Sequence, residues 1–378
     1  MAFDQTSLKI LQPYLDKALQ DLEAKKRLPR ISPEFLKAYE ELTACYRKLK
    51  AIPKSLKGPV FVGMDPTYRC NFSCPYCYLK APLCVKELST EEWINVFKEL
   101  NSLNVLIVCF SGGEPTLRKD LLVLIERAAK YFVAVNMVTN GLLVDDEFSQ
   151  ALREVKVNSV QVSLDGASSN VMDTLRGKGT FKKAINAIQN LIRNQISVHI
   201  GFASTKHNIL DFPNVVRLAS ELQVTSVRTM YLVPEHSGST LVPSDNDYLE
   251  LLNWIRNNSL KYSLRMDFGD PMEHIKIGKL LPTLSINITP EGFILPTPYI
   301  PIAYGNVKEG IRNLWQNGLS NIWQHPVFVA LSTYMKSEFD IPKLKTALGI
   351  DHKHTINIKE LSENQIKQLV DKICLTLS

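Results

Sequence analysis

The sequence predicts an α/β fold in which helices pack on a parallel sheet that is either curled into a partial barrel or doubly wound. Six short segments rich in Val, Ile or Phe alternate with helical patterns between Gly58 and about Pro234. Their starts recur every ~27–45 residues, which is the size of a βαβ unit. In either architecture, ligands bind beyond the carboxyl ends of the strands. Over 378 residues, 45% apolar and 22% charged residues are typical of a globular protein and exclude a mainly disordered chain.

An N-terminal helical arm is predicted over residues 1–57. Leucines recur every three or four residues from Leu8 to Leu22, which gives one apolar stripe along a helix. A second helix is expected to begin at Ser32-Pro33-Glu34, where a capping residue precedes Pro at the first helical position.

The strands and helices of the sheet region, residues 58–235, follow from apolar runs and capping signals. Ser89 and Glu92 form a predicted capping box at the start of the first helix. The predicted strands are Val60–Asp65, Val105–Ser111, Phe132–Thr139, Ser159–Asp165, Ser197–Ser204 and Ser226–Val233. The predicted helices are Ser89–Leu100, Lys119–Tyr131, Asp145–Val155, Thr180–Gln195 and Ile209–Leu222.

The alternation stops after Glu235, so residues 236–335 are predicted to form a small α+β cap. The cap is expected to contain a helix at Ser244–Asn257 and a hairpin that turns at Pro290-Glu291-Gly292. Two short helical patterns follow the hairpin. Residues 336–378 are predicted to form a helical tail, with Ser362 and Gln365 as a capping box.

Charge and apolar patterning narrow the possible partners. Lys+Arg 44 and Asp+Glu 38 give a net charge of +6, which is mild for this length, so no nucleic acid is expected. No apolar run approaches the roughly 20 residues that span a bilayer, so no membrane association is expected either. The first residues alternate apolar and charged side chains, unlike a signal peptide. These observations favour a cytoplasmic protein.

Three of the seven cysteines form the run Cys70-Asn-Phe-Ser-Cys74-Pro-Tyr-Cys77. The odd number of cysteines argues against a disulfide framework. The run follows the first predicted strand, so it lies where active sites form. Three thiolates on one loop can hold three corners of an iron–sulfur cube, or a zinc ion if a fourth ligand such as Cys84 joins them. A third interpretation is that the three cysteines are free thiols.

The second predicted strand runs into Ser111-Gly112-Gly113-Glu114-Pro115, where glycines allow close backbone approach to a ligand. With both motifs in this order, residues 58–235 resemble the radical S-adenosylmethionine (SAM) superfamily. The resemblance implies a partial (β/α)6 TIM-like barrel and one [4Fe–4S] cluster on Cys70, Cys74 and Cys77. SAM would bind the fourth iron. Gly112, Gly113 and Glu114 match the motif that holds its amino group, and Tyr76 matches the aromatic residue beside its adenine.

Polar residues at other strand ends complete the candidate SAM site. In related enzymes a Ser and an Arg at the places of Ser163 and Arg176 contact the carboxylate and ribose region of SAM. The planar guanidinium group of an Arg can bind both oxygens of a carboxylate. The alternative interpretations are that Arg176 is a surface residue and that Asn140 is a turn residue. The candidate cofactor-binding residues besides the cysteines are Tyr76, Gly112, Gly113, Glu114, Pro115, Asn140, Ser163, Asp165 and Arg176.

The resemblance implies reductive cleavage of SAM to a 5′-deoxyadenosyl radical, which abstracts a hydrogen atom from the substrate. An external one-electron reductant of the flavodoxin or ferredoxin type is expected. The substrate is predicted to be a peptide, as for a maturase or epimerase. The alternatives are a small molecule (sugar, nucleoside or tetrapyrrole), radical methyl transfer, and a zinc-stabilised binding protein that is not an enzyme.

The cap shows a weaker resemblance to SPASM and twitch domains, which bind auxiliary iron–sulfur clusters. Thr297 stands where the pattern has its first Cys, and the later cysteine-rich stretch is missing. We therefore predict a degenerate cap without clusters, which favours redox-neutral chemistry. Cys84 is a candidate catalytic residue that would donate a hydrogen atom to the substrate radical, or else a buried loop thiol. Cys109 and Cys374 read as structural.

Overall fold

The computed structural model describes residues 58–376 except 60, 80–83, 104, 106, 133, 234–239, 270–284, 338–339 and 352. The predicted N-terminal arm lies outside the described residues. A ten-stranded sheet has the order β11-β9-β8-β1-β2-β3-β4-β5-β6-β7. Its strands are β1 (Phe61–Met64), β2 (Ile107–Phe110), β3 (Ala134–Thr139), β4 (Ser159–Ser163), β5 (Ser197–Ala203), β6 (Ser226–Met230), β7 (Arg265–Gly269), β8 (Ser285–Ile288), β9 (Phe293–Leu295) and β11 (Gly305–Asn306).

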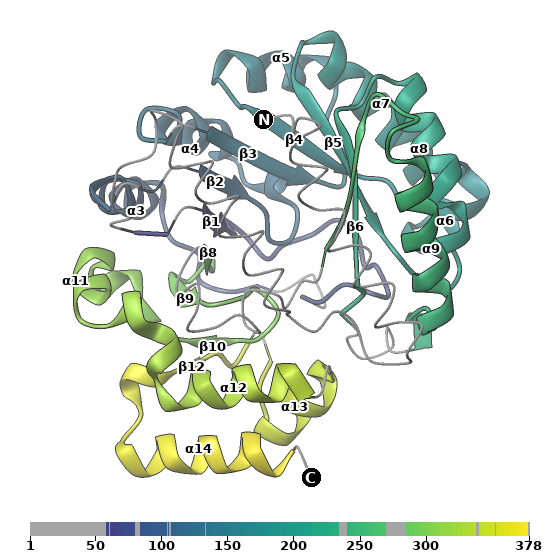
Figure 1. Cartoon of the computed structure of the whole chain (residues 1–378). Helices are drawn as coiled ribbons and strands as arrows, with labels where there is room; N and C mark the ends of the chain where they lie inside the picture. The colour runs from purple at the N-terminus through teal and green to yellow at the C-terminus, as the bar shows by residue number, and fades with distance from the viewer. Residues whose placement is uncertain are drawn as a thin grey trace.

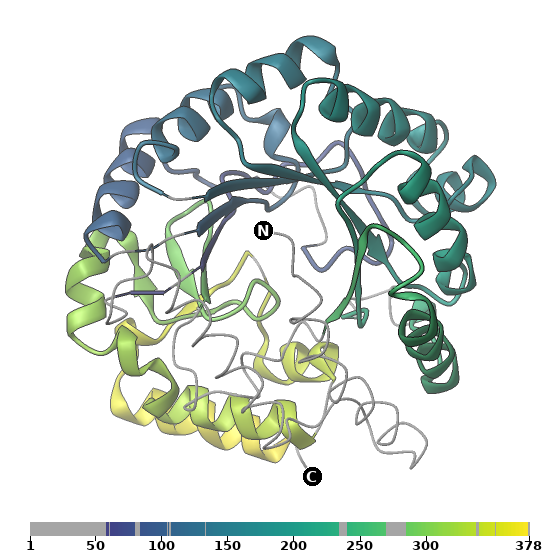
Figure 2. The same cartoon turned by 45° about the horizontal axis from the view of Figure 1, so that its top comes forward.

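The predicted α/β partial barrel is confirmed, because β8 and β1 to β7 pair in parallel and the sheet curls with helices on its outside (Figures 1 and 2). No hydrogen bonding joins β7 to β8 among the described residues, so the barrel is not closed. The outer helices are α3 (Thr90–Ser102), α4 (Leu121–Ala128), α5 (Asp146–Glu154), α6 (Ser169–Arg176), α7 (Thr180–Arg193), α8 (Phe212–Glu221) and α9 (Asp245–Asn258).

The structure differs from the sequence prediction at both ends of the barrel sheet and at one helix. The strand β7 was not predicted, and it extends the parallel sheet beyond β6. The predicted hairpin is confirmed as β8 and β9, but β8 also pairs in parallel with β1. The helix α6, which ends at Arg176, was also not predicted.

The two faces of the curved sheet have opposite character. Residues paired in parallel register point to the same side, and successive residues point to opposite sides. On the convex side the side chains are apolar and at most 1% exposed: Val108, Val135, Val160, Val198 and Val227. The concave side, here called the lumen face, carries Cys109, Asn136, Gln161, His199, Arg228 and Asp267. Because the apolar side chains pack against the helices, the residues that alternate with them along each strand face the inside of the barrel.

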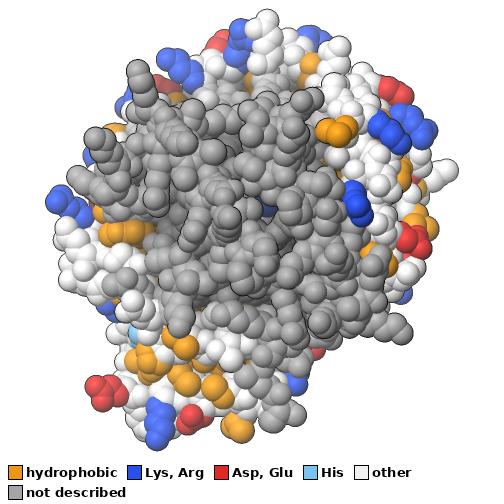
Figure 3. Space-filling view, in the orientation of Figure 1, with side chains coloured by type: hydrophobic (Ala, Val, Ile, Leu, Met, Phe, Trp, Pro, Cys, Tyr) orange, Lys and Arg blue, Asp and Glu red, His pale blue; other side chains and the backbone are white. Residues whose placement is uncertain are grey.

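The C-terminal part packs against the barrel on the side of β1 and α3. Its helices are α11 (Ile311–Gln316), α12 (Pro326–Ser337), α13 (Ile341–Leu348) and α14 (Glu363–Leu375), with a small sheet of β10 (Ile302–Ala303) and β12 (Ile356–Asn357). The predicted capping box of Ser362 and Gln365 opens α14. Hydrophobic side chains gather over this part in Figure 3, and the exposed large ones include Val329 and Leu375. The predicted boundary between residues 335 and 336 lies inside α12, and the division into domains stays a prediction.

No helix in the described part of the chain is both long enough and apolar enough to cross a membrane.

Candidate active site

The loop after β1 carries three free cysteines, Cys70, Cys74 and Cys77. Cys70 and Cys77 pack beside the buried side chains of Tyr68 and Leu79, and Cys74 packs in a second apolar cluster around Tyr76. Burial, together with the charges of Glu114 and the other two thiols, raises the pKa of Cys70 to about 11. No three His, Cys, Asp or Glu side chains of the described residues are already arranged to hold a metal ion. The donor set is nevertheless three half-buried thiols on one loop, which suits iron–sulfur ligation.

Gly112 and Gly113 bring the loop after β2 against the cysteine loop. Gly113 N donates to Thr67 O (2.9 Å), and Glu114 N donates to Arg69 O (2.8 Å). A Cβ on Gly113 would lie 2.3 Å from Arg69 O, and one on Gly112 would lie 2.6 Å from Thr67 O. From the sequence, these glycines are expected to allow close approach of the backbone to a ligand. The structure assigns it to the backbone that precedes Cys70.

Glu114 is 1% exposed and connects the ends of β2 and β3. Its Oε1 accepts hydrogen bonds from Thr116 Oγ1 (2.7 Å), Thr116 N (3.2 Å) and Thr139 Oγ1 (2.8 Å). Its Oε2 accepts one from Asn140 N (2.7 Å). Burial raises the pKa of this carboxyl, and the hydrogen bonds act in the opposite direction. The carboxylate is therefore occupied by the protein itself.

Asn140 is buried at the end of β3, and its Nδ2 donates to Asn71 Oδ1 (2.7 Å) on the cysteine loop. Its Oδ1 accepts from Leu142 N (2.9 Å), which is the turn geometry that the sequence left open. Pro115 is buried at the start of a short 3-10 helix. Both residues therefore shape the loops around the cysteines.

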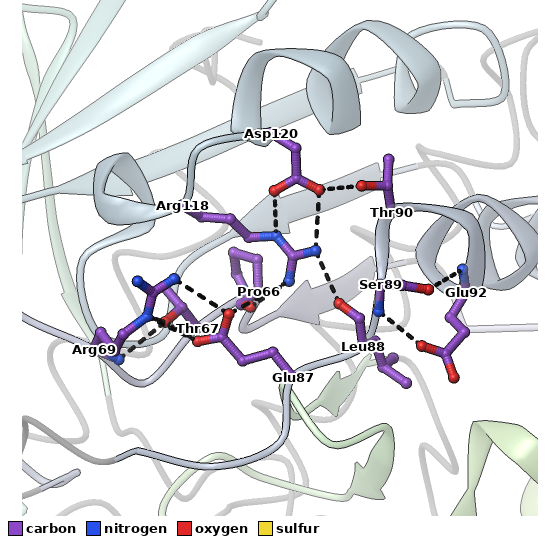
Figure 4. Close-up of polar contacts among 10 residues, drawn as sticks. All are labelled: Pro66, Thr67, Arg69, Glu87, Leu88, Ser89, Thr90, Glu92, Arg118 and Asp120. Carbon is purple, nitrogen blue, oxygen red and sulfur yellow. Dashed lines mark hydrogen bonds and ion pairs between the residues drawn. The ribbon is translucent and has the colours of Figure 1, made fainter.

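Arg118 holds the segment that precedes the cysteines at Pro66 (Figure 4). The residue is 7% exposed, and it donates from Nη1 to Pro66 O (2.8 Å) and from Nη2 to Leu88 O (2.8 Å). Its Nε pairs with Asp120 Oδ1 at 2.7 Å. Glu87 lies in the same network and accepts from Arg69 Nε (3.2 Å). Arg118 could not be identified from the sequence, because an Arg shortly after a Gly-Gly turn is equally expected at the surface.

The carboxyl end of β4 brings Asp165, Arg176 and Tyr76 together. Asp165 Oδ2 accepts from Arg176 Nε (2.5 Å) and from the Tyr76 hydroxyl. The Arg176 guanidinium lies over the Tyr76 ring at 5.5 Å from its centre. The surface reading of Arg176 is wrong, because its side chain is only 10% exposed. Ser163, the last residue of β4, is half-buried on the lumen face.

Three further cysteines of the described residues lie outside the run that contains Cys70, Cys74 and Cys77. Cys84 is exposed, so the alternative interpretation of Cys84 as a buried loop thiol is wrong. Its role as a hydrogen-atom donor stays a prediction. Cys374 is exposed on α14. Cys109, which was interpreted as structural, is half-buried on the lumen face of β2, in register with Gly63 and Asn136.

Asp65 is a second residue that sequence reasoning missed, although it directly precedes the cysteine loop. It is 1% exposed, and its Oδ2 accepts from Asn287 Nδ2 (2.7 Å) on β8. Its Oδ1 has no hydrogen-bond partner among the described residues. Burial raises its pKa to about 7, against the opposing effect of Asn287.

The fold and the site define an α/β partial-barrel enzyme with a thiolate loop at the carboxyl ends of its strands. Residues 64–236 match the Radical SAM superfamily. Residues 64–236 therefore form a radical SAM domain, a type of domain that uses a [4Fe–4S] cluster and SAM.

Individual proteins show the same relationship. The chain is 29% identical over 293 residues to the mycofactocin maturase MftC of Mycobacterium tuberculosis, covering 72% of this chain and 74% of that one. It is 36% identical over 208 residues to the Fe-coproporphyrin III synthase of Methanosarcina barkeri, covering 53% and 52%. The solved structure of Streptococcus suis SuiB bound to the precursor peptide SuiA is similar in fold, with a TM-score of 0.60, 15% identity and coverage of 83% and 82%.

Proposed function

We propose that Cys70, Cys74 and Cys77 ligate the [4Fe–4S] cluster. The observation that supports this assignment is the placement of three free thiols on the loop that follows β1, packed between two apolar clusters. Apolar packing around thiolate ligands limits solvent access and tunes a metal site. The fourth cysteine between β1 and α3, Cys84, is exposed and lies outside the two apolar clusters, so we propose that one coordination position is left for SAM.

SAM is proposed to bind across the ends of β2 to β5. Because the Glu114 carboxylate already accepts hydrogen bonds from Thr116, Thr139 and Asn140, the backbone of Gly112 and Gly113 is the better partner for the SAM amino group. Arg176 is proposed to bind the SAM carboxylate, and Ser163 to lie beside it. The remaining predicted residues, Tyr76, Pro115, Asn140 and Asp165, shape this site.

The cluster and SAM together supply one-electron cleavage of a carbon–sulfur bond and, from it, abstraction of a hydrogen atom from substrate. The residues of the chain hold the cofactor and exclude water. The electron is proposed to come from a flavodoxin- or ferredoxin-type reductant. Thr297 is 1% exposed in the C-terminal part, where its Oγ1 accepts from Tyr299 N (3.4 Å). We propose that this part is a SPASM-like cap without a cluster, so the protein holds a single cluster.

The proposed substrate is a peptide. MftC is a maturase, and SuiB binds a precursor peptide within the same fold. The lumen face is polar, and the described sheet does not close between β7 and β8, which suits a substrate longer than a single small molecule. A tetrapyrrole is the second candidate, because the Fe-coproporphyrin III synthase is 36% identical over 208 residues of the chain.

The test uses full-length protein that has been reconstituted anaerobically with iron and sulfide. About four irons per chain are expected, with loss of iron in Cys77→Ser and no change in the control Cys374→Ser. Dithionite and SAM should yield 5′-deoxyadenosine in the wild type and the control only. Iron bound equally by Cys77→Ser would overturn the ligand assignment.

The substrate class is tested with the same preparation in D₂O. A synthetic peptide pool and precursor iron tetrapyrroles are offered in separate reactions, and products are analysed by mass spectrometry. A peptide that gains one deuterium or loses two hydrogens supports the proposal. Formation of iron coproporphyrin III with an unchanged peptide pool would replace the peptide by the tetrapyrrole.

A further inference from the structure

Asp165, like Glu114, is a buried carboxylate near the cysteine loop whose two oxygens both accept hydrogen bonds. It is 0% exposed, directly after β4. Its Oδ1 accepts a hydrogen bond from Ala203 N (2.8 Å), while Oδ2 accepts from Arg176 Nε (2.5 Å) and from the Tyr76 hydroxyl. Three donors on two oxygens leave this carboxylate little capacity to contact a cofactor, although the sequence placed it among the cofactor-binding residues.

The donors come from three separate elements. Tyr76 lies between Cys74 and Cys77, Arg176 ends α6, and Ala203 ends β5. The backbone of Asp165 is fixed as well, because Asn208 Nδ2 donates to Asp165 O (2.8 Å) and to Ala203 O (3.0 Å). Asp165 therefore joins a helix end and a strand end to the cysteine loop.

The direction of Arg176 follows from this pairing. Its Nε is used by Asp165, while its Nη1 and Nη2 make no hydrogen bond among the described residues. A guanidinium that is anchored through Nε presents its two terminal nitrogens as a fixed fork, the geometry that binds a carboxylate at both oxygens. Such an arrangement loses less conformational entropy when the ligand binds.

The ion pair also lies beside a proposed cluster ligand. Burial raises the pKa of Cys74, the Arg176 charge lowers it, and the Asp165 charge raises it. Both charges of the pair therefore act on the Cys74 sulfur. Charge and hydrogen bonding around the sulfurs are among the factors that set the reduction potential of an iron–sulfur cluster.

We propose that Asp165 is a positioning residue: it holds Arg176 and Tyr76 as one unit beside Cys74, so that the terminal nitrogens of Arg176 meet the carboxylate of SAM. The inference rests on the proposed function, because it takes the SAM carboxylate as the ligand of Arg176. The inference goes beyond the proposed function because it assigns the orientation of Arg176 toward SAM to Asp165, a buried residue that does not contact the cofactor.

The experiment measures SAM binding to the reconstituted, dithionite-reduced holoenzyme through the change in the cluster EPR spectrum. Asp165→Asn is expected to weaken SAM binding at least about tenfold with iron per chain unchanged. The matched control is Asp211→Asn, because Asp211 Oδ2 accepts from Ala167 N (2.7 Å) on the same loop without contacting Arg176. A dissociation constant within about twofold of wild type for Asp165→Asn would overturn the proposal.

Two further variants separate positioning from a general loss of structure. If Asp165 acts through Arg176, then Asp165→Asn combined with Arg176→Lys should bind SAM no more weakly than Arg176→Lys alone. Additive losses would contradict the inference. Asp165→Asn should also raise the midpoint potential of the SAM-free cluster, because a negative charge near Cys74 is lost. Tyr76→Phe removes one hydrogen-bond donor to Asp165 and keeps the ring, and it should weaken SAM binding less than Asp165→Asn. This variant replaces Asp165→Asn in the experiment if Asp165→Asn does not fold.

The proposed function is tested by different measurements from those that test the role of Asp165. Absence of a cluster in the wild type, or of any peptide product, would refute that proposal. The dissociation constants and the non-additivity test decide the role of Asp165 separately.

Discussion

Arg118 donates a 2.8 Å hydrogen bond from Nη1 to the carbonyl oxygen of Pro66, four positions before Cys70. The same guanidinium holds Leu88 O and pairs with Asp120. One buried cation therefore ties the root of the cysteine loop to the start of α3 and the loop before α4. The start of the cysteine loop is thus held by a residue of the loop that follows β2.

Arg118→Lys should lower both stability and iron incorporation. Lysine keeps the charge but cannot reach two carbonyls and a carboxylate at once, and each buried acceptor left without a donor costs about 1–3 kcal/mol. Urea unfolding and iron per chain measure the two effects. Arg127→Lys on the exposed face of α4 is the control, and equal behaviour of both variants would contradict the support role of Arg118.

Gly113→Ala should displace the cysteine loop. The added Cβ would lie 2.3 Å from Arg69 O and 2.7 Å from Tyr68 O, and both are backbone atoms that cannot move by a rotamer change. We expect iron per chain to fall at least about twofold, with a stability loss of about 1–3 kcal/mol typical of overpacking. Gly349→Ala is the comparison, because its φ is +65° but nothing lies within 4 Å. Full iron loading of Gly113→Ala would show that the two loops can separate.

Glu114→Gln should destabilise the ends of β2 and β3. The amide nitrogen would face donors such as Thr139 Oγ1 or Asn140 N, leaving at least one buried donor unpaired at a cost of about 1–3 kcal/mol. Thermal unfolding measures the loss. Glu126→Gln, on the exposed surface of α4, should leave the unfolding temperature nearly unchanged.

Asp65 should make stability fall as the pH rises. Its pKa is about 7 in the folded chain against a usual 3.8, so the folded state keeps a proton that the unfolded state loses. The contribution of Asp65 to the free energy of unfolding is therefore highest below pH 4. It falls by up to about 4 kcal/mol as the pH rises to 7. Asp65→Asn should escape this loss and become increasingly stable relative to wild type between pH 4 and 8.

Asp173 provides the opposite control for that experiment. Its carboxylate accepts from Phe181 N (2.9 Å) and Gly179 N (2.7 Å), and these hydrogen bonds lower its pKa. Asp173→Asn should therefore lose stability relative to wild type as the pH rises from 3 to 6. A pH-independent difference between wild type and Asp65→Asn would show that Asp65 is charged throughout.

Local patterns in the sequence predicted most of the barrel. Apolar runs located the first six strands, and the capping box of Ser89 and Glu92 located the start of α3. The signals of β7 are weaker, because Arg265–Gly269 mixes charged and apolar residues in five positions. Its place in the sheet depends on pairing with β6, which no local pattern contains.

The candidate site could be predicted as a set of residues but not as a set of contacts. The spacing of Cys70, Cys74 and Cys77 indicated the loop and its chemistry. The partners of Asp165 and Glu114 come from other strand ends, so sequence alone did not distinguish a carboxylate that binds a cofactor from one that holds the protein together.

The pairing of β8 with β1 links the cysteine loop to the order in which the chain is synthesised. Asp65 and Asn287 are 222 positions apart, yet they share a hydrogen bond at the foot of the loop. Until the ribosome has released residue 287, β1 lacks this neighbour and Asp65 lacks this partner. Contacts of such high sequence separation form late and slow folding. A cell that loads iron into this protein would therefore deliver it after translation of the C-terminal part, when the strand beneath the thiols is complete.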